Sequence, residues 1–240
     1  MRRAYETRTV NRMVRWGRQP GARWSGWVGA SCVVAVCSAA LAQAPKPAAK
    51  EAKPAKEIKM FDGKTLTGWK ILDKINFDGH GDVAVKDGEI VLGVGKPMTG
   101  IRWAGEELPQ TNYEVTLEAR RIDGTDFFCG LTFPVGKSHC SLVLGGWGGS
   151  LTGLSCLDGF DASENETTGS ISFKQEKWYK VRLRVTPEEV QAWVDNERIV
   201  DVKIANRKVS VRWEMEPMPP FGIATYVTKS GLRNIVLKRL

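Results

Sequence analysis

The chain is poor in the residues and motifs on which most enzyme classes depend. Its 240 residues include only two histidines, His80 and His139, and five cysteines. No Gly-x-Ser-x-Gly, P-loop or His-Glu-x-x-His motif occurs, which excludes the common classes of serine hydrolase, P-loop nucleotidase and zinc peptidase. Without a Cys-x-x-Cys pair, a structural zinc site is not expected. Hydrophobic residues nowhere recur with a helical period over a long stretch, so the pattern does not predict a helical fold.

The part of the chain that is expected to fold also lacks net charge. The whole chain carries 35 basic and 27 acidic residues. Residues 1–44 contribute seven arginines against one glutamate, and residues 45–57 contribute four lysines against two glutamates. Residues 58–240 therefore hold 24 basic and 24 acidic side chains. Because no positive excess is left to attract phosphates, nucleic acid is not an expected partner.

The positive excess belongs to an N-terminal segment that is typical of an export signal. Arginines precede an apolar run from about Trp27 to Leu41, and Ala-Gln-Ala at residues 42–44 matches a cleavage site. The run is short for a membrane span. We therefore expect residues 1–44 to be a cleaved signal peptide and the mature protein to be periplasmic or secreted, without stable membrane insertion. An uncleaved helical anchor is the alternative, and the Pro/Ala/Lys-rich residues 45–57 are expected to be a linker.

Cleavage would leave an odd number of cysteines in the mature chain. Cys129, Cys140 and Cys156 remain, so at most one intrachain disulfide can form. If the glycine-rich residues 145–149 make a turn, the flanking strands place Cys140 opposite Cys156. Two opposed cysteines can form a disulfide only in a pair that is not hydrogen-bonded. The sequence therefore allows either a Cys140–Cys156 disulfide or free thiols at these positions.

From residue 58 onward the pattern has the period of two that is typical of β-strands. Val83, Val85, Ile90 and Leu92 flank Asp87-Gly88 and predict a hairpin with a tight turn. Further alternating runs occur at residues 113–119, 181–185, 190–194 and 232–240, and Glu106 to Gln110 predict one short helical turn. Many short strands at regular spacing predict a single antiparallel β-sandwich domain over residues 58–240.

Both ends of this domain resemble one protein family. Residues 61–69, Phe-Asp-Gly-Lys-Thr-Leu-Thr-Gly-Trp, and residues 231–235, Gly-Leu-Arg-Asn-Ile, are similar to the first and last segments of the 3-keto-disaccharide hydrolase family. Residues 178–201 resemble two adjacent long strands of the concanavalin A-like pattern. The resemblance implies an all-β, concanavalin A-like jelly roll. It also implies hydrolysis or elimination at an oxidised glycosidic bond and a carbohydrate partner.

Aromatic and polar residues in this domain are candidates for sugar binding, because sugars stack on aromatic rings while polar groups bond their hydroxyls. Trp147 lies in Gly-Gly-Trp-Gly-Gly and is either a ligand platform or a ring folded back as a plug. Trp178 is expected in the core. Trp193 is out of phase with Val190, Ala192 and Val194 and is therefore expected to face away from them. The candidate substrate-binding residues are Trp147, His139, Arg121, Trp103, Trp193, Asp158 and Asp161.

Four carboxylates crowd one segment, at Asp158, Asp161, Glu164 and Glu166. Such a segment can hold calcium through oxygen ligands, supply an acid and a base for glycosidic cleavage, or be a solvated loop. The solvated loop is the favoured interpretation because the spacing matches no EF-hand. No resident cofactor is expected, with calcium in this loop as the alternative.

The middle strands depart from the family's pattern. Where the family carries Tyr-Glu-x-Gln-Ile, this chain has Cys140-Ser141-Leu142-Val143-Leu144, so serine and valine replace the two polar residues. Pro134 stands where the family has an arginine. The catalytic residues therefore cannot be assigned from the resemblance. The alternatives to an enzyme are a non-catalytic, lectin-like glycan-binding module and a structural surface module.

Overall fold

The computed structural model describes residues 56–240, and the predicted signal peptide and most of the predicted linker lie outside the described residues. These 185 residues form two antiparallel sheets and two single 3-10 turns, η1 (Ile75–Phe77) and η2 (Trp213–Met215). No helix among them is long and apolar enough to cross a membrane. The first strand begins at Glu57, which pairs with Lys238, so the last residue of the predicted linker already belongs to the fold.

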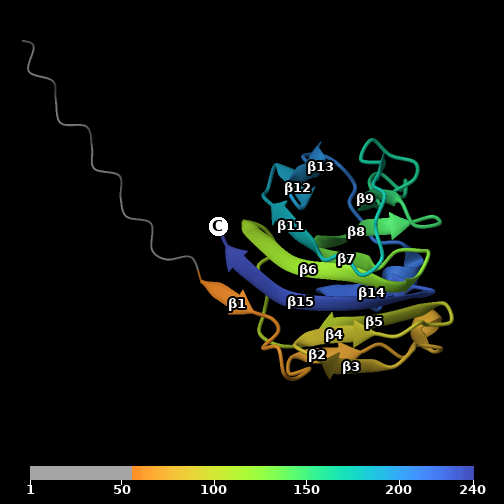
Figure 1. Ribbon diagram of the computed structural model, residues 1–240. Helices are drawn as coiled ribbons and strands as arrows, with labels where there is room; N and C mark the ends of the chain where they lie inside the picture. The colour runs from red at the N-terminus through yellow and green to blue at the C-terminus, as the bar shows by residue number, and fades with distance from the viewer. Residues whose placement is uncertain (1–55) are drawn as a thin grey trace, which may run out of the picture. The chain divides into compact units, whose positions relative to one another are not determined.

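The first layer is an eight-stranded sheet, which faces the viewer in Figure 1. In spatial order its strands are β13 (Glu197–Lys203), β12 (Glu189–Val194), β11 (Tyr179–Val185), β6 (Tyr113–Gly124), β15 (Thr228–Arg239), β4 (Glu89–Leu92) and β3 (Val83–Lys86), with β1 (Glu57–Lys59) paired to β15. The long strands β6 and β15 form the middle of this sheet.

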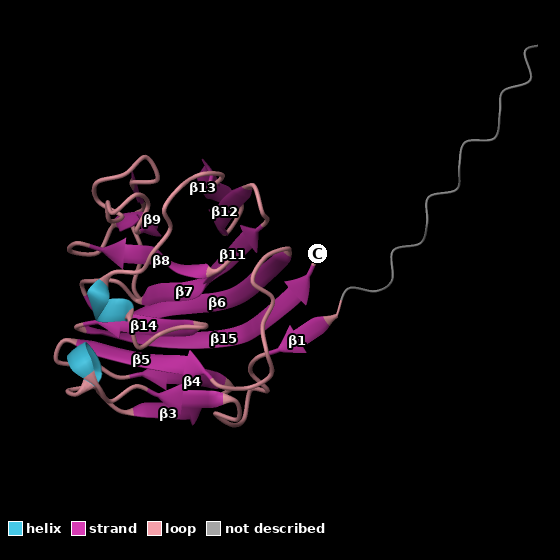
Figure 2. Cartoon of the chain, turned by 180° about the vertical axis from the view of Figure 1, so that it is seen from behind, coloured by secondary structure: helices cyan, strands magenta, loops and turns pink. Residues whose placement is uncertain are grey.

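The second layer is a seven-stranded sheet, which Figure 2 shows from behind. In spatial order its strands are β10 (Gly169–Ser170), β9 (Leu151–Ser155), β8 (Ser138–Gly146), β7 (Cys129–Val135), β14 (Gly222–Tyr226), β5 (Met98–Trp103) and β2 (Trp69–Ile71). The predicted all-β antiparallel sandwich is therefore confirmed.

The main core fills the space between the two sheets. Alternate residues of β6, such as Val115 and Leu117, are buried there and meet Leu131 and Phe133 of β7. The outward residues of β6 are polar and partly exposed, which is the expected pattern for a strand with one solvated face. Strand β7 differs because every one of its residues is buried. Its outer face must therefore be covered as well.

The cover comes from η1 and from the segment that connects β13 to β14, residues 204–221. Phe77, Met215 and Met218 are buried in a second apolar cluster on the outer face of the seven-stranded sheet. Glycines make room for them: a Cβ at Gly222 would lie 2.7 Å from the Met218 Cε. Figure 2 shows η1 and η2 (cyan) beside β5 and β14. The crossing segment and η1 therefore cover part of the outer face of the seven-stranded sheet.

One of two local predictions is confirmed, that of the β3–β4 hairpin, and the other, a helical turn, is wrong. The hairpin β3–β4 forms as predicted, with Asp87 and Gly88 both at positive φ (51° and 80°). The predicted helical turn at residues 106–110 is wrong: the Glu106 carbonyl accepts a hydrogen bond from the Trp103 indole at 2.9 Å, and Pro109 has no N–H to donate to a helix.

The prediction that Trp178 lies in the core is also wrong. Trp178 is half-buried on the outer face of the eight-stranded sheet, with the guanidinium groups of Arg120 and Arg233 at 4.9 and 4.0 Å from its ring centroid. Tyr179, the first residue of β11, occupies the core position instead. Successive side chains of a strand point to opposite faces, so only one of the two neighbours can face the core.

The register of β8 and β9 agrees with the turn predicted at residues 145–149. Ser141 pairs with Ser155, which brings Cys140 and Cys156 to neighbouring positions. Both are free thiols in the structure, as is Cys129, and all three are buried. Burial raises the pKa of Cys129 and Cys140 to about 12, so these thiols are expected to be unreactive.

Candidate functional site

A cavity of about 300 Å³ opens at one end of the outer face of the seven-stranded sheet. We call it the Trp147 cavity. It is lined by Met98, Asp126, Phe127, Ser141, Val143, Trp147, Ser155, Arg212, Glu214, Met215 and Tyr226. These residues come from the ends of β5, β9 and β14, from the middle of β8, from the loop before β7, from the glycine-rich turn after β8 and from the crossing segment.

Aromatic rings form the walls of this cavity. Trp147 is 48% exposed, and the rings of Phe127 and Tyr226 lie 5.8 Å apart. Trp147 is therefore neither a free platform nor a buried plug: it is a wall that keeps about half of its surface open. Its backbone has φ +48°, so it sits at the left-handed position of the tight turn between β8 and β9. A strained position of this kind recurs at ligand sites.

Arg121 holds the turn that carries Trp147. Its Nη2 donates hydrogen bonds to the carbonyl oxygens of Gly149 at 2.8 Å, Asp126 at 3.1 Å and Gly145 at 3.3 Å. Gly145 has φ +81°, and a Cβ there would collide with the guanidinium group. Burial lowers the pKa of Arg121. All the hydrogen bonds of its side chain go to backbone carbonyl groups. Arg121 was predicted to bind substrate, and the structure places it behind the site as a positioning residue.

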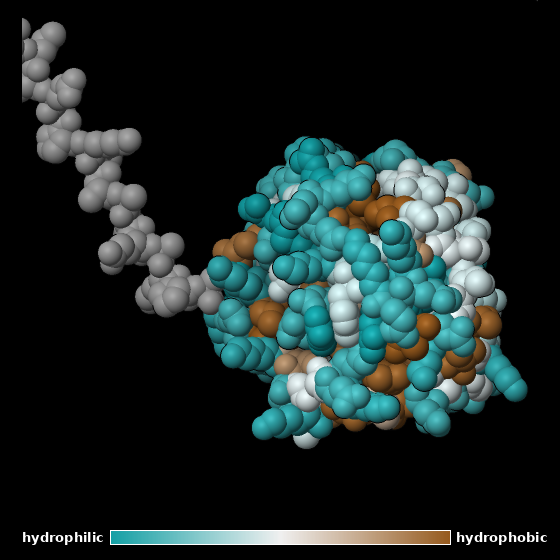
Figure 3. All heavy atoms as spheres, viewed as in Figure 1, coloured by the Kyte–Doolittle hydropathy of each residue, from teal (hydrophilic) through white to brown (hydrophobic). Residues whose placement is uncertain are grey.

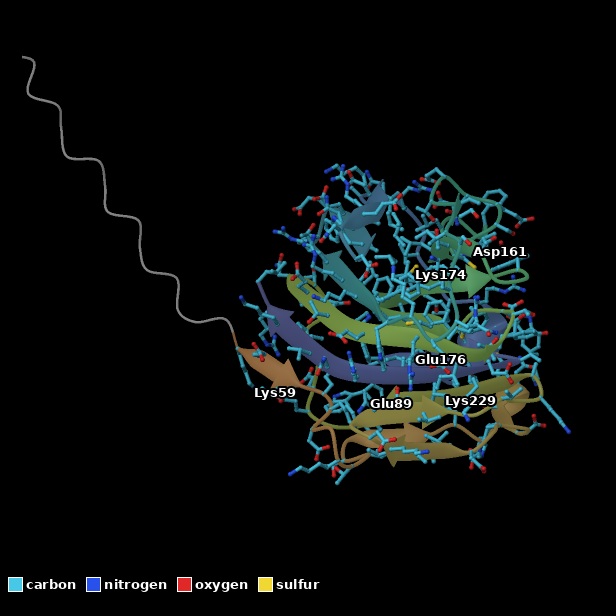
Figure 4. All side chains as sticks on the ribbon, viewed as in Figure 1. Lys59, Glu89, Asp161, Lys174, Glu176 and Lys229 are labelled. Atoms are coloured by element: carbon cyan, nitrogen blue, oxygen red, sulfur yellow. The ribbon has the colours of Figure 1, made fainter. Side chains whose placement is uncertain are left out.

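An ion-pair network borders the cavity. Arg212 donates from Nε and Nη2 to the two carboxylate oxygens of Glu214 at 3.2 and 3.0 Å, and from Nη1 to Asp161 at 2.5 Å. The bidentate bond to Glu214 raises the pKa of Arg212. The guanidinium carbon lies 6.0 Å from the Trp147 ring centroid. Asp161, labelled in Figure 4, thus stands directly behind an arginine of the cavity wall.

The remaining carboxylate of the cavity is Asp126. Its two oxygens accept backbone hydrogen bonds from Phe127 at 2.7 Å and from Gly148 at 3.2 Å. It therefore ties the loop before β7 to the turn that carries Trp147. The cavity holds two carboxylates, Asp126 and Glu214, on different segments of chain, and both are already hydrogen-bonded.

Small hydroxyl groups form part of the floor. Ser141 shares a hydrogen bond of 2.7 Å with Thr132, and Ser155 lies beside Ser141 on the next strand. Ser141 and Val143 are the residues that replace the glutamate and glutamine of the family pattern. Both line this cavity. The structure therefore places the two departures from that pattern inside the Trp147 cavity.

His139 and Trp103 lie together in a second cavity of about 470 Å³, at the opposite end of the same sheet face. Burial lowers the pKa of His139. Trp103 is almost fully buried and packs edge-on against Trp69, with ring centroids 5.4 Å apart. Lys137 also lines this second cavity. These two predicted residues are brought together, but away from Trp147.

Trp193 and Asp158 lie apart from both cavities. Trp193 faces outward from the eight-stranded sheet, and the Arg182 guanidinium lies 3.5 Å from its ring centroid. Asp158 is paired with Arg207 at 2.5 Å, as is Glu166. The hydrogen bond from the Lys208 backbone and the pair with Arg207 lower the pKa of Asp158, and Arg207 lowers that of Glu166.

The arginine pairs bear on the calcium alternative for the acidic loop. Three of its four carboxylates, those of Asp158, Asp161 and Glu166, are neutralised by Arg207 or Arg212. Within residues 56–240, no three or more His, Cys, Asp or Glu side chains are grouped so that they could hold a metal ion. A calcium ion bound there would have to displace these arginines.

Among the cavity residues that sequence reasoning missed are its charged and phenolic groups, Asp126, Arg212, Glu214 and Tyr226. Two of them belong to the crossing segment, which has no strand period. The one available signal was Arg-Trp-Glu at residues 212–214, an aromatic between opposite charges in a stretch without period. Loops of that composition often carry function.

The fold is similar to solved structures that share little sequence with it. A protein of unknown function with a galectin-like fold from Bacillus subtilis aligns with a TM-score of 0.53 and 12% identity, over 79% of this chain and 97% of that chain. A Crh5 transglycosylase in complex with NAG aligns with a TM-score of 0.50 and 10% identity, over 78% and 84%. A laminarinase from Flavobacterium gives 0.49 and 13%, over 78% and 100%.

Sequence comparison gives a more specific result. No curated protein sequence matches the chain. The model of the 3-keto-alpha-glucoside-1,2-lyase-like domain family matches residues 56–238, which is nearly the whole described domain. The chain therefore belongs to the 3-keto-alpha-glucoside-1,2-lyase-like domain family, and this membership indicates a glycan-related function.

Proposed function

We propose that the protein is exported and binds a saccharide in the Trp147 cavity. The observation that carries the proposal is the pairing of a half-exposed indole with the Arg212–Glu214 ion pair on one cavity wall. A sugar ring presents an apolar face that stacks on an aromatic ring, and hydroxyl groups that bond to charged side chains at its edge. The cavity offers both within one volume of about 300 Å³.

Cleavage of an oxidised glycosidic bond is the second candidate. Two observations favour it: the family membership, and the presence of Asp126 and Glu214 in one cavity. Hydrolysis of a glycosidic bond uses one carboxyl group as acid and another as base. Elimination beside a ketone needs a base for the proton on the neighbouring carbon and an acid for the departing oxygen. Because both carboxylates are already hydrogen-bonded, binding without cleavage agrees better with the geometry.

The experiment that tests both candidates is calorimetry with parallel product analysis. The protein is titrated with 3-keto-disaccharides and with the corresponding unoxidised disaccharides, and each mixture is then analysed for released sugar. We expect saturable heat in the wild type and weaker binding in Arg212→Met. Product that disappears in Asp126→Asn or Glu214→Gln would establish cleavage.

Glu118→Gln is the matched control. Glu118 is paired with Arg233 on the outer face of the eight-stranded sheet, with a distance of 2.7 Å between their nearest atoms. Its loss removes an arginine–glutamate pair of the same kind but at a distance from the cavity, so binding should not change. Absence of heat with every sugar would contradict the proposal and favour a structural surface module.

A further inference from the structure

The exposed aromatic side chains of the described domain gather in one region. Four such side chains are more than one third exposed: Trp147 at 48%, Phe160 at 55%, Trp213 at 60% and Tyr226 at 39%. The other aromatic side chains of residues 56–240 are buried or half-buried. Large exposed rings mark ligand or partner surfaces when they cluster. Here all four belong to segments that border the Trp147 cavity.

Two of these rings lie outside the cavity that the other two line. Trp213 stands between Arg212 and Glu214, which both line the cavity, but it does not line it itself. Phe160 directly precedes Asp161, whose carboxylate is bonded to Arg212. The two outer rings are therefore held within one residue of groups that are fixed to the cavity wall.

Short turns hold the backbone at both outer rings. In η2, the Met215 N–H donates to the Arg212 carbonyl at 2.9 Å, and the Met215 side chain is buried. Around Phe160, its N–H donates to the Leu157 carbonyl at 2.9 Å, and its own carbonyl accepts from the Leu157 N–H at 3.0 Å. Rings on such fixed turns lose little freedom when a ligand stacks on them.

The two half-buried tryptophans of the other sheet show what a covered ring looks like. The Arg182 guanidinium lies over the Trp193 ring, and those of Arg120 and Arg233 both lie over the Trp178 ring. No guanidinium or ammonium group within the described residues lies over the ring of Trp213 or Phe160. Trp213 and Phe160 keep 60% and 55% of their surface exposed. Figure 3 shows the face of the eight-stranded sheet, where apolar side chains (brown) lie in separate patches among hydrophilic ones (teal).

The volume and the charge of the site narrow the class of ligand. A volume of about 300 Å³ lies at the lower end of the range for small-molecule sites, so a ligand in the cavity that also reaches Trp213 must extend out of it. Two cations, Arg212 in the wall and Arg121 behind the Trp147 turn, stand against the three carboxylates of Asp126, Asp161 and Glu214, which leaves one negative charge in excess. A negatively charged sugar chain would be repelled.

We propose that the ligand is a neutral oligosaccharide longer than a disaccharide, with one end in the Trp147 cavity and further sugar rings stacked on Trp213 and Phe160. This inference rests on the proposed function. It adds the length and the charge of the ligand to that proposal.

The test is affinity as a function of chain length. Gluco-oligosaccharides of two to six units, in α-1,4, β-1,4 and β-1,3 linkage, are titrated into the protein by calorimetry, with oligogalacturonides of equal length as charged counterparts. For at least one neutral series, we expect the affinity to rise about tenfold from two to four units, the equivalent of about 1.4 kcal/mol. The charged chains should bind more weakly.

Variants assign the gain to the outer rings. Trp213→Ala should remove most of the rise with length and leave the disaccharide affinity unchanged, Phe160→Ala should remove a smaller part, and Trp213→Tyr should retain most of it. Trp193→Ala is the matched control and should alter no affinity. Because Trp213 and Phe160 are largely exposed, the melting temperatures of these variants should stay close to that of the wild type.

Several outcomes would overturn the inference. One is disaccharide binding without any gain in longer chains, and another is a gain that survives both alanine variants. A loss in Trp213→Ala that is equal for all lengths would assign the ring to the cavity itself. Self-association that sedimentation detects and Trp213→Ala abolishes would assign the ring to a contact between copies. If no disaccharide binds either, the proposed function itself fails, which is a different result from the others.

Discussion

Replacement of Trp147 by alanine separates binding from folding in one variant. A tryptophan side chain presents at most about 250 Å², and with 48% of it exposed, about 120 Å² is open to a ligand. A sugar ring that covers half of this area gains about 1.5 kcal/mol at about 25 cal/mol per Å². Trp147→Ala should therefore weaken saccharide binding more than tenfold.

The same substitution should cost little stability. About half of the ring already faces the open cavity, so water can fill the space that truncation leaves, and the turn already holds a non-glycine residue at positive φ. We expect a loss of about 1–2 kcal/mol in the free energy of unfolding, well below the ~3–5 kcal/mol of a fully buried large-to-small change. Calorimetry gives the affinity, and urea denaturation gives the stability.

Two further variants frame this result. Trp147→Phe should fall between wild type and alanine in affinity, because a smaller ring still stacks. Trp193→Ala removes a half-buried tryptophan from the other sheet and should leave binding intact. A stability loss of 3–5 kcal/mol in Trp147→Ala, together with unchanged affinity, would refute the reasoning and make Trp147 a structural plug.

Four further predictions concern other parts of the molecule. Arg121→Met leaves three carbonyl groups behind the Trp147 turn without their donor, so denaturation should show a loss of about 2–4 kcal/mol, and Arg121→Lys should restore part of it. The Lys208 backbone hydrogen bond and the pair with Arg207 lower the pKa of Asp158, and Arg207 lowers that of Glu166, so the stability that Arg207 gives is present above about pH 5 and is lost as the pH falls through the lowered pKa values. Denaturation midpoints of Arg207→Gln should thus differ from wild type at pH 6 and converge with it in acid; a constant difference would contradict this. The three buried cysteines should react with a thiol reagent only after unfolding, whereas a Cys140–Cys156 disulfide found by mass mapping would contradict the structure. N-terminal sequencing of the exported protein should begin near residue 45, and a mature chain that retains Trp27 would reject cleavage.

The sequence by itself determined the class of fold and indicated the family. Alternation over residues 113–119 and 181–185 predicted strands with one buried face, because period two is a local property of an extended chain. The Asp87-Gly88 turn was readable for the same reason: it depends on two residues that tolerate positive φ. The segments at the two ends of the domain, residues 61–69 and 231–235, were enough to indicate the family.

Tertiary structure decided which side chains form the site. The sequence offered Trp147, His139 and Trp103 as one set, but the sheet separates Trp147 from the other two by the length of its strands. Arg212 and Glu214 reach the cavity only because the crossing segment passes over the outer face of the seven-stranded sheet. No local pattern encodes that path, since it depends on the packing of Met215 against Gly130 of β7, where a Cβ would lie 3.3 Å from the Met215 Cε, and these two residues are far apart in the chain.

The same reason explains the residues whose roles changed. Trp178 is a large aromatic residue of the kind common in cores, but its position next to Tyr179 turns its side chain outward, where Arg120 and Arg233 cover it. Arg121 is a charged residue of the kind that binds ligands, but carbonyl groups of the Trp147 turn, far from it in the chain, accept its hydrogen bonds. A sequence states which groups exist and on which side of a strand they lie, whereas the packing of distant segments decides what each group meets.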